Sequence, residues 1–401
     1  MNVLFVHNNF PAQYRFVARE LAKDPANRVV AIGSSSAAAP ANIRLIKYAM
    51  ATGEAAHVHP FARRFELECR RAEEVLYSLS SLSGSGFTPD VIFAHPGWGE
   101  TLPLRTMFPK AKIILYCEFF YGANGKDVGF DPEFPMTGLD GHVALHLKNA
   151  SSLLALTECD LGIAPTAWQK STFPKEFQAK IRVAHEGVDT EETAPDADAE
   201  LYLPNGVKLT ADDEVVTYVS RNLEPLRGFH IFMRALPNIL RERPKAHVVI
   251  AGGDGTSYGA RPPQGSTWKS LFFNEVRHDI DPNRVHFLGS VPREQYLRIL
   301  QISSVHVYLT YPFVLSWSLL EAMSAGCLVV VSDTAPLRDA VAADRGVLVP
   351  FFDVQALSDS VIDALARPKS YQAKRKKARQ HVVKHFDAMR VCLPELMKLV
   401  E

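Results

Sequence analysis

The alternation of short β-branched segments with longer helical segments constrains this chain more than any other feature. Before residue 190 the β-branched segments lie at 2–7, 28–34, 90–95, 112–117, 161–166 and 180–187. Helical patterns such as 12–24 and 167–174 lie between them. Strands separated by helices are typical of a parallel sheet built from βαβ units. The first half is therefore predicted to be a doubly wound α/β domain.

The same alternation stops and then restarts in the second half. Residues 189–213 are acidic and rich in Pro and Gly, which predicts a surface connector with a hinge near 200–212. Strand segments follow at 214–220, 247–253, 284–290, 305–310, 327–333 and 346–350. A chain of 401 residues is long enough for two cores.

We therefore predict an α/β protein of two doubly wound, Rossmann-like domains facing each other across a cleft. The predicted parts are an N-terminal domain at 1–205, a C-terminal domain at 206–375, and a final helix at 376–401 that packs back towards the first domain. Ligands of open parallel sheets bind beyond the carboxyl ends of the strands. The strand-to-helix loops are therefore where functional residues are expected.

Charge and composition exclude several classes of function. Lys plus Arg and Asp plus Glu number 44 each, so the overall charge does not favour nucleic acid as a partner. The start of the chain has no export signal and no apolar run reaches 18 residues. The five cysteines match no disulfide framework or zinc spacing. We therefore expect reduced thiols, no structural metal and a cytoplasmic location.

Polar side chains follow the first strand, in the loop 7–14. The loop lacks the G-x-G-x-x-G turn of a dinucleotide-binding fold, which counts against a dehydrogenase. Asn8, Asn9 and Gln13 are suited to hydrogen-bond a polyhydroxylated ligand. The alternative is that the asparagines cap the following helix, since Asn is a good N-cap.

Two arginines flank the first strand-to-helix loop of the second domain. Arg221 and Arg227 suit a diphosphate, because a guanidinium holds phosphate oxygens in a bidentate manner. The alternative is that both are surface cations paired with Glu224. A helix predicted to begin near Ser316 offers amides to phosphate, and Glu321 lies a turn further on, either to accept hydroxyls or as a satisfied core carboxylate.

The segments 220–228, 250–255, 284–310 and 315–341 together resemble the second domain of GT-B glycosyltransferases of the retaining family 4 group. The first half resembles the family more loosely, through 89–100 and 180–192. The resemblance implies a glycosyltransferase that moves a sugar from a nucleotide-diphosphate sugar to an acceptor hydroxyl. It also implies retention of the anomeric configuration, without a metal or a cofactor.

The resemblance assigns residues to the donor. Arg221 and Arg227 hold the diphosphate, with Arg227 where the family has lysine, and Glu321 holds the ribose. Position 313 carries Phe where the family has a sugar-binding glutamate, so sugar recognition passes to the amides of 314–317 or to other side chains. The expected donor-binding residues are Gly253, Asp254, Phe313, Val314, Leu315, Ser316, Trp317 and Ser318.

The resemblance also assigns the acceptor side, to the first domain. His95 matches the family's acceptor-side histidine, and Glu118, Asn8, Asn9 and Gln13 are expected around it. The aromatic run 119–121 is a candidate for stacking on the acceptor. His7 and His185 remain unassigned.

The alternatives are a sugar-nucleotide epimerase, a phosphorylase, and a sugar-nucleotide-binding protein without activity. The acceptor is expected to be a sugar, a lipid-linked molecule or another hydroxyl compound. The basic run 374–380, with Arg63, Arg64, Arg70 and Arg71, suits either peripheral membrane contact or solvated helix faces. The sequence does not fix the sugar, the nucleotide, the acceptor or the oligomeric state.

Overall fold

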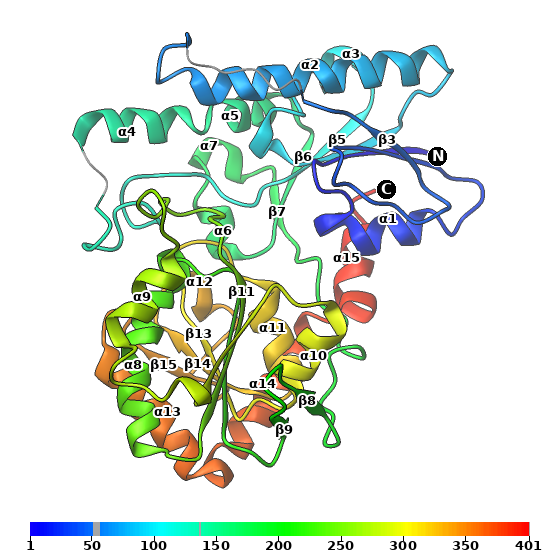
Figure 1. Ribbon diagram of the computed structural model, residues 1–401. Helices are drawn as coiled ribbons and strands as arrows, with labels where there is room; N and C mark the ends of the chain where they lie inside the picture. Colours follow the sequence, from blue (N-terminus) through cyan, green and yellow to red (C-terminus); the bar gives the residue numbers. More distant parts are fainter. Residues whose placement is uncertain (51–56, 136–137, 401) are drawn as a thin grey trace. The chain divides into compact units, whose positions relative to one another are not determined.

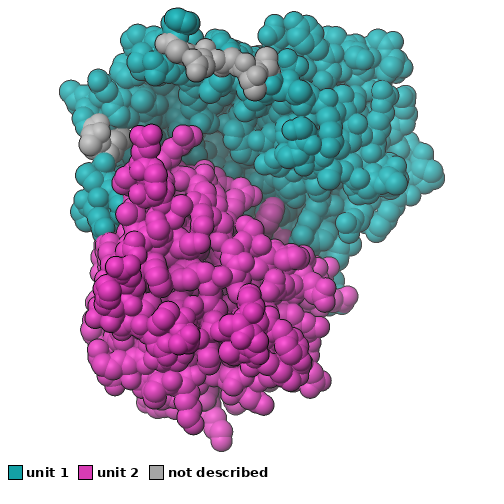
Figure 2. Space-filling model, in the orientation of Figure 1, with its two compact units in different colours: residues 1–186, 388–401 teal, residues 187–387 magenta. Residues whose placement is uncertain are grey.

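A computed structural model describes residues 1–50, 57–135 and 138–400 (Figure 1). The chain forms two compact units (Figure 2). Unit 1 comprises Met1–Glu186 and Ala388–Glu401, and unit 2 comprises Gly187–Asp387. The sequence placed the boundary later, at 205, because the segment after Glu186 reads as a connector.

Unit 1 contains a seven-stranded parallel sheet with the order β3-β2-β1-β4-β5-β6-β7. Its strands are β1 (Asn2–Val6), β2 (Arg28–Gly33), β3 (Arg44–Lys47), β4 (Val91–Ala94), β5 (Lys112–Tyr116), β6 (Leu161–Ala164) and β7 (Ile181–Val183). Its helices are α1 (Arg15–Leu21), α2 (Arg63–Gly84), α3 (Leu104–Met107), α4 (Gly138–Leu147), α5 (Ala150–Glu158), α6 (Ala167–Ser171), α7 (Lys175–Gln178) and α15 (Leu393–Met397).

Unit 2 contains a six-stranded parallel sheet with the order β12-β11-β10-β13-β14-β15. Its strands are β10 (Val215–Asn222), β11 (His247–Gly253), β12 (Val285–Gly289), β13 (Val305–Tyr308), β14 (Leu328–Ser332) and β15 (Val347–Val349). Its helices are α8 (Phe229–Glu242), α9 (Trp268–Val276), α10 (Arg293–Gln301), α11 (Trp317–Ser324), α12 (Ala335–Arg338), α13 (Val354–Ala366) and α14 (Gln372–His385). Both sheets therefore have the doubly wound order in which the chain reverses direction beside its first strand.

The inner strands β1, β4 and β5 of unit 1 are buried on both faces, which is why these segments read as continuous apolar runs. Leu4 and Val6 pack with α2 and α5 on one face of the sheet. Val3 and Phe5 pack with α1 and α15 on the other, where Leu393 joins them. Successive side chains of β1 therefore point to opposite faces of the sheet and enter two different cores.

Every predicted strand segment overlaps an observed strand, so the predicted fold class is confirmed. β3 was missed, because its sequence RLIK carries a charge at both ends and lies at the sheet edge. No helix in the described part of the chain is long and apolar enough to cross a membrane. All five cysteines are free.

The predicted surface connector is wrong for the stretch around residue 205. The strands β8 (Glu200–Tyr202) and β9 (Lys208–Thr210) form an antiparallel hairpin there. Leu201 and Leu209 are buried and pack with Val249 and Ile299 of unit 2. A segment whose side chains fill a core cannot serve as the predicted hinge at 200–212.

Three histidines of unit 2 make the stability of the protein sensitive to acid. Burial lowers the pKa of His286, His306 and His381 to about 4 in each case. In the unfolded chain the same groups titrate near their ordinary pKa of about 6.5. The unfolded state therefore gains protons first as pH falls, and the folded state does not follow until about pH 4.

We therefore expect the free energy of unfolding to fall as pH drops from about 6.5 to about 4, by up to about 1.4 kcal/mol per pH unit for the fully buried His306 and by less for His286 and His381, where solvent screens the effect. Urea unfolding at a series of pH values measures this slope. His306→Gln should lower this slope by the contribution of one proton. His306 is fully buried, and its Nδ1 is bonded to the Thr217 hydroxyl. If the unaltered protein and the His306→Gln variant show the same slope, His306 does not contribute to the acid sensitivity.

Candidate functional site

The predicted donor residues of unit 2 lie where the sheet order reverses. β10 has β11 on one side and β13 on the other, and the connections that leave β10 and β13 run to opposite sides of this point. Arg227 follows β10 in a short 3-10 turn (Pro225–Arg227), and the loop to α11 follows β13. Ligands of doubly wound sheets bind at this position.

Arg227 is held by neutral oxygens alone. Its Nη1 donates to the hydroxyl oxygens of Tyr308 (2.7 Å) and Thr310 (2.8 Å), and is 3.4 Å from the carbonyl oxygen of Val314. No carboxylate of the described residues pairs with it. A guanidinium fixed in this way keeps its full charge for an anion.

Arg221 and Glu224 do not form the ion pairs of the alternative interpretation. Arg221 is exposed at the end of β10, and its side chain has no bond to the described residues. Glu224 is buried, and its Oε2 accepts from the backbone amides of Ser257, Tyr258 and Gly259 at 3.2–3.4 Å. The Glu224 carboxylate is thus bound by these three amides, and neither arginine has an acidic partner among the described residues.

Glu224→Ala should loosen this loop, because three amides lose their common acceptor and buried unpaired donors cost about 1–3 kcal/mol. We expect faster amide hydrogen exchange at residues 257–259. Glu224→Gln keeps an acceptor oxygen and should show a smaller change. Equal exchange in the alanine variant and the unaltered protein would show that Glu224 does not hold the loop.

The loop before α11 buries most of the predicted sugar-facing positions. Phe313 is 1% exposed, with its ring centre 4.9 Å from that of Tyr258 and 5.7 Å from Cζ of Arg227. Val314 and Leu315 are also buried. Ser316 is the N-cap of α11 and accepts from the amide of Ser318, as the predicted helix start requires.

Glu321 is buried on α11 and both of its oxygens are engaged. Oε1 accepts from Arg293 (2.7 Å) and Oε2 from the Tyr296 hydroxyl (2.5 Å). Arg293 also pairs with Glu192 at 2.6 Å. Each carboxylate oxygen has a second lone pair, so Glu321 is fixed in orientation and still able to accept from a ligand hydroxyl.

The predicted pair Gly253 and Asp254 lies at the end of β11. Asp254 forms a partly exposed ion pair with Lys269 at 2.7 Å. A side chain added at Gly253 would meet the amide oxygen of Asn222 at 2.7 Å, which explains glycine there. Asn222 also accepts from the amide of Gly255, so this turn is bonded to the end of β10.

The predicted acceptor residues of unit 1 lie at the corresponding reversal of its own sheet, between β1 and β4. His7 follows β1 and His95 follows β4, with ring centres 5.4 Å apart. Each Nδ1 accepts from a backbone amide, that of Asn9 for His7 (3.0 Å) and that of Gly97 for His95 (3.1 Å). In the neutral rings the proton is therefore on Nε2.

Several polar atoms converge beside these rings without partners. Nε2 of His95 lies 3.3 Å from Oε2 of Glu118 without hydrogen-bond geometry, and Gln13 donates to Oε1 of Glu118 at 3.4 Å. Among the described residues, Oδ1 of Asn8 is buried and unpaired, and the Gln13 side chain lies close enough to His7 to affect its charge without forming a hydrogen bond of good geometry. Buried polar atoms without good hydrogen bonds are rare, and a group of them suits a polar ligand. Burial, followed by His95, lowers the pKa of His7 well below its ordinary value.

The helix-capping alternative for the asparagines is wrong. The N-cap residues of the short 3-10 turn (Ala12–Tyr14) and of α1 are Pro11 and Tyr14, and neither makes a side-chain cap. Asn9 instead accepts from the Ser36 hydroxyl at 2.8 Å. Asn8 keeps its amide oxygen unpaired, as the ligand interpretation requires.

Two aromatic residues of this cluster were missed. Trp98 stacks on His95 with ring centres 4.1 Å apart, and Tyr116 lies against the same ring at 5.9 Å. Tyr116 also donates to Glu186 at 2.8 Å. Tyr116 is the last residue of β5 and precedes Glu118 by two positions, so the sequence could have placed it in this cluster.

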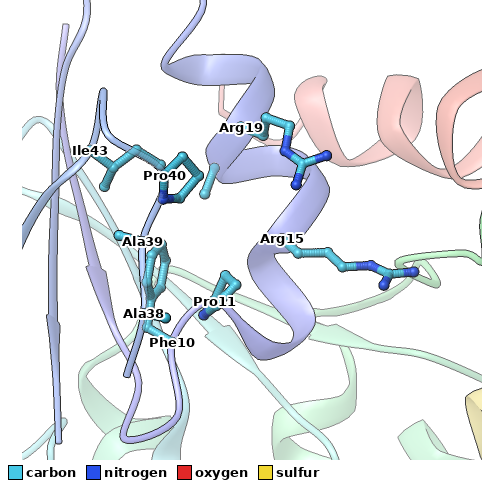
Figure 3. Close-up of a pocket in the computed structure, with 9 residues that line it drawn as sticks. Phe10, Pro11, Arg15, Arg19, Ala38, Ala39, Pro40 and Ile43 are labelled. Carbon is cyan, nitrogen blue, oxygen red and sulfur yellow. The ribbon is translucent and has the colours of Figure 1, made fainter. Parts of the chain in front are cut away.

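A hollow of about 240 Å³ lies beside α1, between Phe10 and Pro11 on the one hand and residues 38–43 on the other (Figure 3). Mostly apolar residues line it, including Phe10, Pro40 and Ile43. Figure 3 shows the head groups of Arg15 and Arg19 directed away from Pro40 and Ile43. Apart from Arg15 and Arg19, its lining residues have apolar side chains, so the hollow offers few polar groups for sugar recognition.

The basic run 374–380 is used largely within unit 2. Arg375 donates to the carbonyl oxygen of Gly326 at 2.6 Å, and Arg379 bonds the carbonyl oxygen of Ser324. These carbonyls lie at the C-terminal end of α11, where cations are favourable. The run therefore has a structural role that the sequence did not show.

Two family models match the chain. Residues 25–193 match the glycosyl transferase family 4 group, and residues 205–381 match the glycosyl transferases group 1. A search of curated proteins finds no match in sequence.

Solved structures share the fold over whole chains. Sucrose-phosphate synthase from Thermosynechococcus elongatus is 17% identical, with 100% and 98% of the two chains covered and a TM-score of 0.73. Anabaena HepE in complex with UDP and glucose is 15% identical, with 100% and 99% covered and a TM-score of 0.66. A trehalose-6-phosphate protein from E. coli bound with UDP-2-fluoro glucose is 13% identical, with the same coverage and TM-score.

The two parallel sheets and these matches define a glycosyltransferase with the GT-B fold. The chain belongs to the family 4 group of these enzymes.

Proposed function

We propose that the protein transfers a glycosyl group from a nucleoside-diphosphate sugar to an acceptor hydroxyl, with retention of the anomeric configuration. The observation that carries the proposal is the Arg227 guanidinium, which is fixed by neutral oxygens and has no acidic partner in the described chain. HepE and the E. coli protein were solved with UDP or a UDP-sugar, which supports a donor of this class.

In the proposed reaction the bond between the anomeric carbon and the diphosphate oxygen breaks, while a bond to the acceptor oxygen forms on the same face. The proton of the acceptor hydroxyl passes to the departing phosphate oxygen. Arg221, Arg227 and the amides at the start of α11 stabilise the charge that develops on the diphosphate. Glu321, oriented by Arg293 and Tyr296, accepts from the ribose hydroxyls.

The acceptor is proposed to bind unit 1 through His95, Gln13, Glu118 and Asn8. Nε2 of His95, Oε1 of Gln13 and Oδ1 of Asn8 are buried without a hydrogen bond to the described residues, and together they offer both donors and acceptors, as a polyhydroxylated molecule requires. No side chain in this scheme binds a metal, so we expect chelators to leave turnover unchanged.

A panel of UDP-, GDP- and ADP-sugars tests the proposal by nucleotide release with and without candidate acceptors. We expect one nucleotide to be released faster when an acceptor is present, with the product anomer matching the donor by NMR. Conversion of the sugar nucleotide without an acceptor would identify an epimerase. Binding without any conversion would identify a non-catalytic protein.

A further inference from the structure

Helix α4 (Gly138–Leu147) of unit 1 is rich in apolar residues and is almost wholly exposed. All 10 of its residues lie in the described part of the chain, and only Leu145 is buried. Leu139 is 84% exposed, Val143 43% and Leu147 37%. Figure 1 shows α4 at the margin of unit 1. A helix with this many apolar side chains is normally covered by other protein, and the single chain leaves α4 uncovered.

The C-terminal end of α4 is fixed to the loop that follows β5. The amide of Lys148 donates to the carbonyl oxygen of Ala144 at 3.0 Å, and Nζ of Lys148 lies 3.4 Å from the ring centre of Tyr121. The Asn149 side chain bonds both the amide (2.9 Å) and the carbonyl (3.0 Å) of Tyr121. The exposed side chains of α4 therefore belong to an anchored helix and form a defined surface.

Leu139, Val143 and Leu147 form an apolar stripe, because residues four apart lie on the same side of a helix. In an antiparallel pair of such helices centred on Val143, Leu139 of one helix faces Leu147 of the other. Asp140 then faces His146, and both side chains are exposed. An imidazole N–H donates to a carboxylate whether the ring is neutral or charged. The stripe and the polar residues beside it therefore complement themselves about a two-fold axis.

We propose that α4 is a dimerisation surface that pairs with α4 of a second copy of this chain, in antiparallel orientation. A membrane suits this helix less well, because residues 138–147 contain no Lys or Arg and interfacial helices carry such cations. A helix of this length is about 15 Å long, so the pair buries less than the roughly 1,200 Å² of a stable interface. The dimer is therefore reversible, with a dissociation constant on the order of 10 μM.

Sedimentation equilibrium of the full chain, from about 1 to about 200 μM, spans the expected dissociation constant. Val143→Asp should weaken association about a hundredfold or more, because two carboxylates then meet at the two-fold axis. Val183→Asp is the matched control, since Val183 lies on the edge strand β7 and is 50% exposed. It should leave the dissociation constant unchanged.

A charge exchange tests the orientation of the two helices. His146→Asp places a second carboxylate opposite Asp140 of the other copy and should weaken association about tenfold. Adding Asp140→His to the same chain restores an opposite pair and should recover most of the affinity, as coupled residues do.

Disulfide cross-linking tests the register. The background is Cys69→Ser, since the other four cysteines are buried. Val143→Cys should cross-link two copies on mild oxidation, because position 143 meets itself at the axis. Leu139→Cys should cross-link only when it is mixed with Leu147→Cys.

The inference is overturned if the protein remains monomeric at about 200 μM. It is also overturned if Val143→Asp associates as Val183→Asp does, or if Leu139→Cys cross-links with itself as readily as Val143→Cys. Binding of a monomer to phosphatidylglycerol vesicles that Val143→Asp abolishes would assign α4 to a membrane instead. A monomer that turns over a sugar nucleotide would refute the dimer alone, and a dimer without turnover would refute the proposed function alone.

Discussion

Arg227→Ala is expected to weaken binding of the donor nucleotide about a hundredfold, or roughly 2.7 kcal/mol. The hydroxyls of Tyr308 and Thr310 hold the Arg227 guanidinium in place, and no carboxylate of the described residues pairs with it. Charge-assisted hydrogen bonds to a diphosphate are worth about 1.5–3 kcal/mol each. Calorimetric titration with the nucleoside diphosphate that binds best in the donor panel measures the loss.

Two further variants make this result specific. Arg234→Ala removes a cation of α8 that pairs with Glu275 at 2.8 Å, and should change donor affinity less than about twofold. Arg227→Lys keeps the charge but not the planar guanidinium. Its donor affinity should lie between those of the unaltered protein and the alanine variant. Donor affinity that is equal in Arg227→Ala and Arg234→Ala would remove Arg227 from the diphosphate site.

Phe313→Glu is expected to cost both stability and donor binding. Removing a fully buried ring costs about 3–5 kcal/mol, and the new carboxylate lies within reach of the Arg227 guanidinium. A carboxylate there would pair with Arg227 and use the charge that the donor requires. Urea unfolding and nucleotide titration measure the two effects separately.

Phe313→Gln is the matched control, since glutamine has the shape of glutamate without its charge. We expect a similar loss of stability and a much smaller loss of donor affinity. The combination of Phe313→Glu with Arg227→Ala should bind donor no more weakly than Arg227→Ala alone. If the Glu and Gln variants bind the donor equally, position 313 does not reach Arg227.

The sequence was sufficient for the strands that lie inside the sheets, because buried parallel strands read as apolar runs in any context. It was not sufficient for the hairpin at residues 200–210. The alternation of Leu201, Leu203, Val207 and Leu209 about the turn Asn205–Gly206 was present, but the acidic residues before it dominated the composition. Burial of one face of a short hairpin depends on elements far away in sequence, here Val249 of β11 and Ile299 of α10.

For the site, motif positions identified strand ends correctly but not the bonds made there. The sequence placed Glu224 between two arginines, and charge alone suggested ion pairs. Its actual partners are amides 33 to 35 residues further on. Likewise Arg293 reaches Glu321 only because α10 and α11 pack in the fold. Such long-range pairing follows from topology, which a local pattern does not contain.

The path of the chain through the two units has a consequence for biosynthesis. The entry and exit of unit 2 are joined, since the amide of Val188 donates to Phe386 at 2.9 Å and Val188 bridges to Asp387. Unit 1 takes Leu393 and Leu396 into the core that contains Phe5. During translation unit 2 is thus made as one continuous stretch, whereas unit 1 is complete only after its last helix, α15, has been made. Its first strands emerge from the ribosome long before the residues that cover them, and they are the part of the nascent chain most in need of a chaperone.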